Sequence, residues 1–405
     1  MSQKLVMEGL LVVDFTQFFA GPLVTQSLAE LGAEVIKVEF APVGDAGRQM
    51  TIKDHTRSGY FIQQNTGKKS LCVDLRNPEG KQLVMDLIKQ ADVMVENFAP
   101  GAISRLGFGW DVVHELNPRL IMTSVSAFGQ SGPLSAMPGF DFTGQAYAGV
   151  SSMVGDPDGA PSLIGLALGD CGAGMSALAA LNAALYYREK TGEGQYVEST
   201  LVDFLFRAHE VNVVLNSVSD GEFVPHRSGS HAGAYAPVGY FKTRDGYFSL
   251  TVPESHWPRL CKAMEKPELA TNEKFINNAA RLENIDELVA IIEEWTCSFE
   301  TTQDVIDSLT KSHIPAAPVL SVVEAMNHPH LIERETVRTI DDPILGEVKI
   351  AGMPINFIDK PRHAGGPAPL LGEHNASVLK QYLSMSDEKI EQLTNSGVLT
   401  SSSVG

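Results

Sequence analysis

One stretch near the N-terminus decides the fold: residues 10–39 read LLVVDFTQFFAGPLVTQSLAELGAEVIKVE. Residues 10–15 form a short apolar run rich in β-branched side chains, which is typical of a buried strand. Pro22 is well placed to begin a helix, and residues 33–39 are the next predicted strand. The apolar face of that helix carries Val24, Leu28 and Leu31. A strand, helix and strand in this order require a parallel pair of strands joined by a right-handed crossover.

The same alternation continues along the chain. Further strands are predicted at residues 70–74, 92–96 and 119–125, and Asn77-Pro78 predicts the start of a helix. Alternating strands and helices predict an α/β fold with a doubly wound, Rossmann-like parallel sheet. Ligands of such sheets bind at the carboxyl ends of the strands. Residues 17–20, 73–76 and 97–98 fall at these ends.

The texture of the sequence changes after the first half. Residues 220–237 are rich in Gly, Ser, His and Pro, which indicates a loop or linker. We therefore predict a large Rossmann-like domain over residues 1–220 and a smaller α/β domain with linkers over 221–330. Residues 331–405 are expected to return to the large domain.

Composition excludes several classes of partner. The chain has 405 residues, 43% of them hydrophobic, and a net charge of −18. Such a negative charge argues against nucleic acid or an anionic membrane as a partner, and no apolar run reaches the ~20 residues of a membrane span. The 4 cysteines are scattered, without paired metal-ligand spacing. We expect a cytoplasmic protein with reduced thiols and no metal site.

A second stretch concentrates the chemistry: residues 166–174 read LALGDCGAG. The following residues are small or apolar on every face, which predicts a buried helix. Asp170 between two glycines is open to two interpretations. It is either a helix N-cap or a nucleophile whose glycine neighbours leave space for a substrate. Cys171 beside it could be a thiol nucleophile, but its position favours a small buried side chain.

Familiar cofactor motifs are missing. The first turn, residues 17–22, holds one glycine where a dinucleotide-binding turn needs three, and no nucleophile elbow or Walker loop occurs. Cations do recur at predicted strand ends and loops, which suggests a ligand that bears phosphate. They are Arg48, Lys68, Lys69, Arg76 and Arg105.

An ordered set of motifs resembles one family, the class III CoA-transferases, which include the formyl-CoA and carnitine CoA-transferases. The set runs in family order over nearly the whole chain. It comprises residues 14–22 (DFTQFFAGP), 31–39 (LGAEVIKVE), 44–48 (GDAGR), 95–101 (VENFAPG), 138–145 (PGFDFTGQ), 168–170 (LGD), 191–195 (TGEGQ), 314–319 (IPAAPV) and 371–374 (LGEH).

The resemblance implies a mechanism and an assembly. The family's nucleophilic aspartate falls on Asp170. It would accept CoA from an acyl-CoA donor as a covalent aspartyl-CoA thioester and pass it to a small carboxylic acid. Acyl-CoA would be a substrate, with no tightly bound cofactor. The family also implies an interlocked homodimer, in which each chain threads through the other.

The resemblance also assigns binding positions one by one. Gln17, Phe18 and Ala20 match a turn that contacts CoA through its backbone. Val73 and Arg76 match residues near the adenine and phosphates. Asn97, Phe98, Arg105 and Leu106 match the segment that lines the pantetheine and diphosphate. Phe140 and Asp141 match positions beside the reacting centre.

Two departures from the family pattern limit the resemblance. A basic residue that some members carry is Pro138 here. The glycine-rich loop of formyl-CoA transferases is replaced by residues 228–234 (SGSHAGA), which puts oxalate specificity in question. The alternative function is that of the sister branch, the 2-methylacyl-CoA racemases. Those isomerases pair the aspartate with a histidine, but Phe140 stands at that position and offers no base for exchanging an α-proton.

Overall fold

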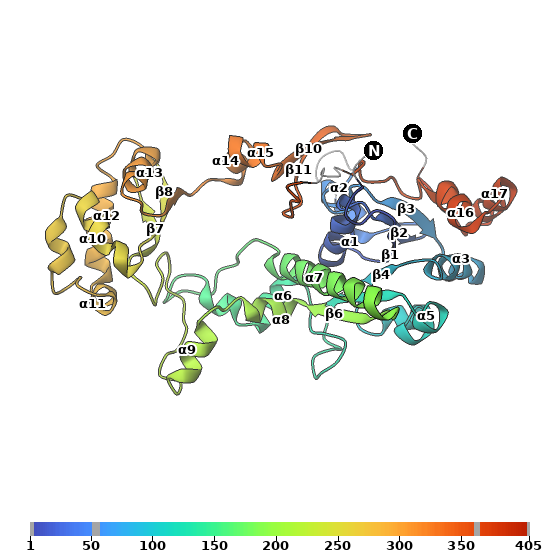
Figure 1. Cartoon of the computed structure of the whole chain (residues 1–405), viewed down its shortest axis with the longest axis horizontal. Helices are drawn as coiled ribbons and strands as arrows, with labels where there is room; N and C mark the ends of the chain where they lie inside the picture. Colours follow the sequence, from blue (N-terminus) through green and yellow to red (C-terminus); the bar gives the residue numbers. More distant parts are fainter. Residues whose placement is uncertain (1–3, 51–56, 360–364, 403–405) are drawn as a thin grey trace. The chain divides into compact units, whose positions relative to one another are not determined.

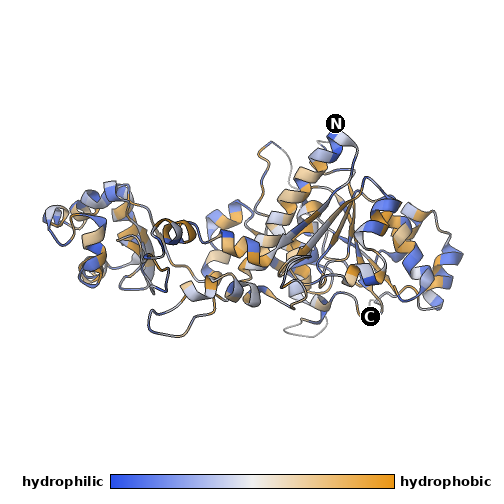
Figure 2. Ribbon diagram, turned by 90° about the horizontal axis from the view of Figure 1, so that it is seen from below, coloured by the Kyte–Doolittle hydropathy of each residue, from blue (hydrophilic) through white to orange (hydrophobic). Residues whose placement is uncertain are grey.

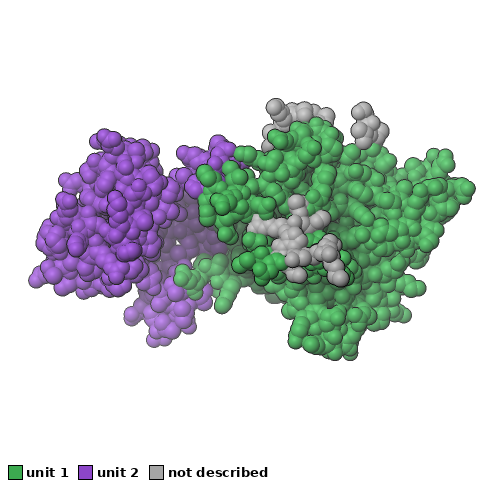
Figure 3. Space-filling model, turned by 45° about the horizontal axis from the view of Figure 1, so that its top comes forward, with its two compact units in different colours: residues 1–148, 165–210, 329–405 green, residues 149–164, 211–328 purple. Residues whose placement is uncertain are grey.

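The computed structural model describes residues 4–50, 57–359 and 365–402. The chain divides into two compact units, each described here by itself (Figure 3). Unit 1 comprises residues 1–148, 165–210 and 329–405, and unit 2 comprises residues 149–164 and 211–328. The domain boundaries expected from the sequence, after residues 220 and 330, stay a prediction.

Unit 1 is built on a six-stranded parallel sheet in the order β3-β2-β1-β4-β5-β6 (Figure 1). The strands are β1 (Leu11–Asp14), β2 (Glu34–Phe40), β3 (Lys69–Val73), β4 (Val93–Glu96), β5 (Ile121–Ser126) and β6 (Tyr196–Thr200). This sheet confirms the predicted doubly wound α/β fold. The strand order reverses between β1 and β4, and crevices at such reversals are where ligands bind.

Helices cover both faces of the sheet. The helices of unit 1 are α1 (Ala20–Glu30), α2 (Gly59–Asn65), α3 (Pro78–Ile88), α4 (Ala102–Leu106), α5 (Trp110–Leu116), α6 (Asp141–Tyr147), α7 (Leu168–Thr191), α8 (Leu201–Arg207), α15 (Pro329–Glu333), α16 (Asn375–Leu383) and α17 (Asp387–Asn395), with the 3-10 helix η1 (Ala46–Gln49). A hairpin of β10 (Val337–Asp342) and β11 (Gly346–Ala351) completes the unit.

The core explains why these strands form. Every residue of β1 and β4 is buried, as expected for parallel strands covered on both faces. On one face, Val13 and Phe15 pack with apolar residues of α3, α5, α16 and α17. Helices α1 and α7 pack together and against the strands on the other side. Figure 2 shows hydrophobic residues along the sheet and on one side of its helices.

Helix α1 begins earlier than the sequence predicted. It starts at Ala20, two residues before Pro22. The proline occupies the first turn, where backbone N–H groups have no partner within the helix, so its missing N–H costs nothing there.

Helix α7 differs from its predicted complete burial. Ala177, Leu181 and Ala184 are buried, but Ala179, Ala183 and other residues along the opposite side are exposed. Tyr186 is 68% exposed. Within one chain, this 24-residue helix therefore has one covered face and one open face.

The C-terminal segment covers the edge of the sheet. The backbone N–H of His374 donates to the Ser70 carbonyl at 3.0 Å, and that of Asp74 donates to the Val398 carbonyl at 2.8 Å. The Asn375 side chain accepts from the Cys72 N–H at 2.9 Å. Strand β3 is an edge strand, so these bonds satisfy backbone groups that would otherwise face solvent.

Unit 2 has its own core. Its antiparallel sheet, in the order β7-β8-β9, consists of β7 (Val238–Lys242), β8 (Tyr247–Thr251) and β9 (Ala316–Pro318). Its helices are α9 (Asn212–Val218), α10 (Trp257–Ala263), α11 (Asn278–Glu283), α12 (Ile285–Thr296), α13 (Thr302–Lys311) and α14 (Val322–Met326), with the 3-10 helices η2 (Val150–Met153), η3 (Glu254–His256) and η4 (Pro267–Thr271). Phe241, Phe248 and Trp257 anchor this core.

The turn between α7 and β6 yields a stability prediction. A Cβ at Gly194 would lie 2.0 Å from the Leu120 carbonyl oxygen, a backbone atom that cannot move aside alone. We expect Gly194→Ala to lower the free energy of unfolding by about 1–3 kcal/mol in chemical denaturation. The control is Gly59→Ala, at an exposed helix start with no atom within 4 Å, which should be neutral or slightly stabilising. Equal effects of the two substitutions would contradict this packing.

Candidate active site

Two loops meet where the strand order reverses. The Gln17 N–H donates to Oδ1 of Asn97 at 2.8 Å, and Nδ2 of Asn97 donates back to the Gln17 carbonyl at 2.7 Å. The first loop follows β1 and the second follows β4. The structure therefore brings together the predicted CoA-binding segments at residues 17–20 and 97–98.

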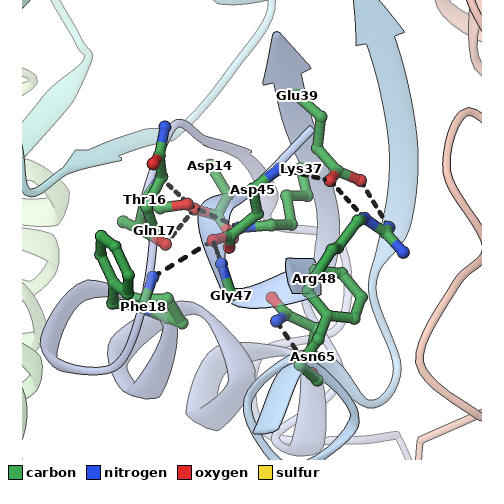
Figure 4. A network of polar contacts seen from close by, with 12 residues as sticks. Asp14, Thr16, Gln17, Phe18, Lys37, Glu39, Asp45, Gly47, Arg48 and Asn65 are labelled. Carbon is green, nitrogen blue, oxygen red and sulfur yellow. Dashed lines mark hydrogen bonds and ion pairs between the residues drawn. The ribbon is translucent and has the colours of Figure 1, made fainter. Parts of the chain in front are cut away.

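A buried ionic network lies beneath the first loop (Figure 4). The Lys37 ammonium contacts the Asp45 carboxylate at 2.8 Å, and the Lys68 ammonium contacts Asp14 at 3.0 Å. Arg48 forms a bidentate pair with Glu39, with both distances at 2.7 Å. Within this network three acids and three cations balance, as buried charges require.

The pKa values of the network follow from this balance. Burial alone would raise the pKa of Asp14, but Lys68 and Lys37 outweigh it and lower that pKa. Burial lowers the pKa of Lys68 to about 8, although Asp14 opposes the shift. Asp14 also accepts hydrogen bonds from Thr16 and Thr25, so it joins the first loop to α1.

This pairing corrects the predicted cluster of phosphate-binding cations. The Lys68 side chain is fully buried on Asp14, and the Arg48 guanidinium is held by Glu39 and lies over the Phe61 ring. Lys69 pairs with Glu34. These cations neutralise acids of the chain, and tertiary pairing of this kind is invisible in a local sequence pattern.

Asp170 lies in the first turn of α7. The helix begins at Leu168 after Ala167, so Asp170 is its third residue and the predicted N-cap role is wrong. The Asp170 backbone N–H donates to Oδ2 of Asp141 at 2.8 Å. The other oxygen of Asp141 accepts from Nε2 of Gln145, which also donates to the Leu166 carbonyl at 3.1 Å. Asp141 thus satisfies a free N–H at the start of α7.

The Asp170 carboxylate is held in an unusual electrostatic setting. Burial, with a smaller contribution from Asp141, raises its pKa to about 7. Within the described ranges, no cation forms an ion pair with Asp170, and its carboxylate oxygens accept no hydrogen bond. Burial and the charges of Asp170 and Asp45 raise the pKa of Tyr60 to about 12, which keeps a neutral phenol near the two acids.

The glycines beside Asp170 serve packing instead of substrate access. A Cβ on Gly172 would lie 1.8 Å from the Phe204 ring, and one on Gly169 would lie 2.8 Å from Leu205. The prediction that these glycines leave an open approach for a ligand is therefore wrong. They let α8 pack closely against the start of α7.

The other predicted positions differ in what their side chains can reach. Val73 is fully buried, backbone included, and its carbonyl accepts from the Ala41 N–H at 3.2 Å, so the structure gives a ligand no access to it and the predicted contact is wrong. The exposed Arg76 side chain pairs with Asp74 at 2.8 Å. Arg105 and Leu106 end the short helix α4. Phe98 stacks on Phe40, with ring centroids 5.7 Å apart.

Aromatic rings link the first loop to α6. The rings of Phe18 and Phe140 meet edge to face, with centroids 6.1 Å apart. Phe140 is 70% exposed and directly precedes Asp141. Ala20, at the start of α1, lies against α7, as its carbonyl oxygen would be 2.7 Å from a Cβ on Gly174.

Cys171 is exposed, so its predicted burial is wrong.

Sequence reasoning missed several residues of this site. Lys37 left a usable signal, because a charged side chain inside a buried strand must find a partner. Asp45 lay in a quoted motif but received no role. Gln145 also lay in a quoted motif, four residues after Asp141 on the same helix, but received no role. Tyr60 left no local signal, since its position depends on how α2 packs.

The described part of the chain holds neither a cluster of metal ligands nor a membrane-spanning helix. Residues 4–50, 57–359 and 365–402 contain no group of three or more His, Cys, Asp or Glu side chains that could hold a metal ion. Among the same residues, no helix is long and apolar enough to span a bilayer.

Comparison with known proteins finds relatives over nearly the whole chain. The model of CoA-transferase family III matches residues 7–375. A formyl-CoA:oxalate CoA-transferase from Streptomyces coelicolor is 35% identical, covering 97% of this chain and 99% of that protein. A succinyl-CoA:mesaconate CoA-transferase from Haloarcula hispanica is also 35% identical, covering 93% and 96%. The crystal structure of a CAIB/BAIF family protein from Brucella suis has a TM-score of 0.81 and 32% identity, covering 94% and 100%.

The raised pKa of Asp170 predicts a pH-dependent stability. Between its unfolded value near 4 and about 7, the folded state retains a proton that the unfolded state has lost, so rising pH destabilises the fold through this group. Asp170→Asn removes this effect. The variant's unfolding midpoint should exceed that of the wild type by about 3 °C more at pH 8 than at pH 5. Asp203→Asn, at an exposed acid in the first turn of α8, should show no such gain. A pH-independent difference for Asp170→Asn would contradict the raised pKa.

Proposed function

Because this chain belongs to CoA-transferase family III, we propose that it moves CoA from an acyl-CoA donor to a carboxylic acid through a covalent intermediate on Asp170. The observation that carries the proposal is the Asp170 carboxylate itself. Its pKa is raised, none of the described residues pairs it with a cation, and Asp141 accepts a hydrogen bond from its backbone N–H.

The proposed reaction proceeds by carbonyl exchange. The Asp170 carboxylate attacks the thioester carbonyl, forming a mixed anhydride while the C–S bond breaks and the CoA thiolate leaves. The thiolate then attacks the Asp170 carbonyl carbon, releasing the donor acid and leaving aspartyl-CoA. The acceptor carboxylate repeats the two exchanges in reverse, which regenerates Asp170 without net proton transfer.

The environment of Asp170 suits the first step. A carboxylate with a raised pKa is more basic and a better nucleophile than an ordinary one. Among the described residues no cation or hydrogen-bond donor contacts the carboxylate, so none of them stabilises its charge before attack. Tyr60 stays protonated and can donate to oxygen charge that develops nearby.

We assign CoA binding to the loops at the strand reversal. Gln17, Phe18 and Ala20 lie on the first loop and Asn97 and Phe98 on the second. Arg76, Arg105 and Leu106 complete the proposed site. CoA enters as a substrate in this scheme, not as a resident cofactor.

The alternative function, α-proton exchange as in 2-methylacyl-CoA racemases, lacks a second base. Phe140 carries no titratable group at the position where the racemases place a histidine. The named relatives transfer CoA to or from oxalate and mesaconate. Neither acid is assigned to this chain. Its acceptor must be identified by assaying transfer to a panel of carboxylic acids.

We also propose a homodimer located in the cytoplasm. The exposed stripe of α7, with Ala179, Ala183 and Tyr186, is apolar and uncovered within one chain. Helix α9 has no buried residue although it carries Val213, Val214 and Val218. The family resemblance implies that a second copy of the chain covers these exposed apolar residues. The free cysteines suit a reducing compartment.

Replacing the nucleophile should stop transfer without abolishing CoA binding. We expect Asp170→Ala to lower turnover by about four orders of magnitude or more, measured by mass spectrometry of new thioesters. Wild-type enzyme mixed with acyl-CoA and quenched with hydroxylamine should yield a hydroxamate on the peptide that contains Asp170. Borohydride should instead reduce the trapped thioester.

The matched control is Cys171→Ser, at the exposed neighbouring nucleophile. This variant should transfer CoA and form the hydroxamate normally. Normal turnover by Asp170→Ala, or label on Cys171 instead, would refute the assignment. Deuterium uptake at the α-carbon without exchange of thioester partners would favour the isomerase.

Light scattering tests the assembly. We expect a solution mass of twice the 43.7 kDa of one chain, because apolar residues along α7 and α9 need a cover. Tyr186→Glu should lower the yield of this species. A stable, active species with the mass of one chain would contradict the homodimer.

A further inference from the structure

Lys37 and Asp45 hold the loop that follows β1 from below. Nζ of Lys37 donates to the Thr16 carbonyl at 2.6 Å and pairs with Asp45 at 2.8 Å. Oδ1 of Asp45 accepts from the Gly47 N–H at 2.8 Å and from the Phe18 N–H at 3.3 Å. Both side chains are almost completely buried, so neither can contact a substrate directly.

The loop needs such support. Phe18 has φ of +62°, the left-handed region that a bulky side chain rarely adopts. Conformations of this kind persist only where the surroundings fix them. Here Lys37 binds the Thr16 carbonyl, and Asn97 binds the backbone N–H and carbonyl of Gln17. Asp45 accepts from the N–H of Phe18.

The held residue leads directly to the nucleophile. The Phe18 ring lies edge-on to Phe140, the residue before Asp141. Asp141 in turn holds the Asp170 N–H. The chain of contacts therefore runs from the buried pair through one strained residue to the catalytic carboxylate, as Figure 4 shows for its first part.

The rest of the network does not need this pair for neutrality. Asp14 has its own cation in Lys68, and Glu39 has Arg48. Removing Lys37 and Asp45 together thus leaves no unmatched charge among the remaining four residues. The pair can be changed without breaking the neutralisation of its neighbours, which makes a role beyond neutralisation testable.

We propose that Asp45 and Lys37 are positioning residues for acyl-CoA: they fix the Gln17–Phe18 loop in the strained conformation that receives CoA beside Asp170. This inference rests on the proposed function, because it takes CoA as the ligand of that loop. It adds two buried residues, neither of which touches the substrate, to the determinants of CoA affinity.

Paired substitutions separate positioning from stability. In Lys37→Met with Asp45→Leu, two apolar side chains of similar size replace the ion pair, which commonly offsets the loss of the pair itself, while the Gly47 and Phe18 N–H groups lose their acceptor. In Lys37→Met with Asp45→Asn, the charges are equally absent but an acceptor for the Phe18 N–H is kept. The control is Glu30→Leu with Arg338→Met, another largely buried pair, at the far end of α1.

Calorimetric titration with free CoA, thermal unfolding and steady-state kinetics are measured on each full-length protein. We expect the Leu variant to bind CoA at least tenfold more weakly than the wild type, with a raised KM for acyl-CoA and a smaller change in kcat. The Asn variant should recover part of the affinity. The control variant should bind CoA as the wild type does, whatever its unfolding midpoint.

The outcomes distinguish the two proposals. Wild-type affinity in the Leu variant, or affinity that merely follows the unfolding midpoint across all four proteins, overturns the positioning role. If the Leu variant does not fold, equal CoA affinity of the Asn variant and the wild type, with the Phe18→Ala variant also unaffected, overturns it as well. Wild-type protein that neither binds CoA nor transfers it overturns the proposed function, and this inference with it.

Discussion

The carboxylate of Asp14, at the buried end of the central strand β1, constrains everything around it. A fully buried charge must be matched, and Asp14 finds its partners in Thr16, Thr25 and Lys68. These residues belong to the loop after β1, to α1 and to the turn before β3. One acid thus draws three separate segments to the end of the sheet where the strand order reverses.

A similar arrangement occurs at Asp170, the proposed nucleophile. Asp141 binds the backbone N–H of Asp170 instead of its carboxylate, and it adds a like charge nearby. A carboxylate kept in this state costs folding energy that an amide would not. Stability given up at one residue is a common feature of functional sites. The dense packing of Gly169 and Gly172 against α8 helps hold the helix start in place.

Local sequence patterns were enough to predict the fold. The site was harder to predict, because its residues pair with partners far away in the sequence. Short apolar runs located β1 to β5, and Asn77-Pro78 located the start of α3, because those signals lie within a few neighbouring residues. Asp170 was conspicuous as a lone charge among small residues. Lys68 was misread because its partner, Asp14, lies 54 positions away. The packing role of Gly172 was equally hidden, since it depends on Phe204 of the following helix, α8.

The path of the chain has a consequence for its synthesis. Strand β3 forms early in translation, yet the segment that caps its open edge contains His374, Asn375 and Val398. All of unit 2 must leave the ribosome before those residues do. During that interval the nascent sheet presents unpaired backbone groups to neighbouring chains, and such edges promote aggregation. Ribosomes that translate this protein therefore carry a sheet whose β3 edge stays unpaired until residues 374–398 have emerged.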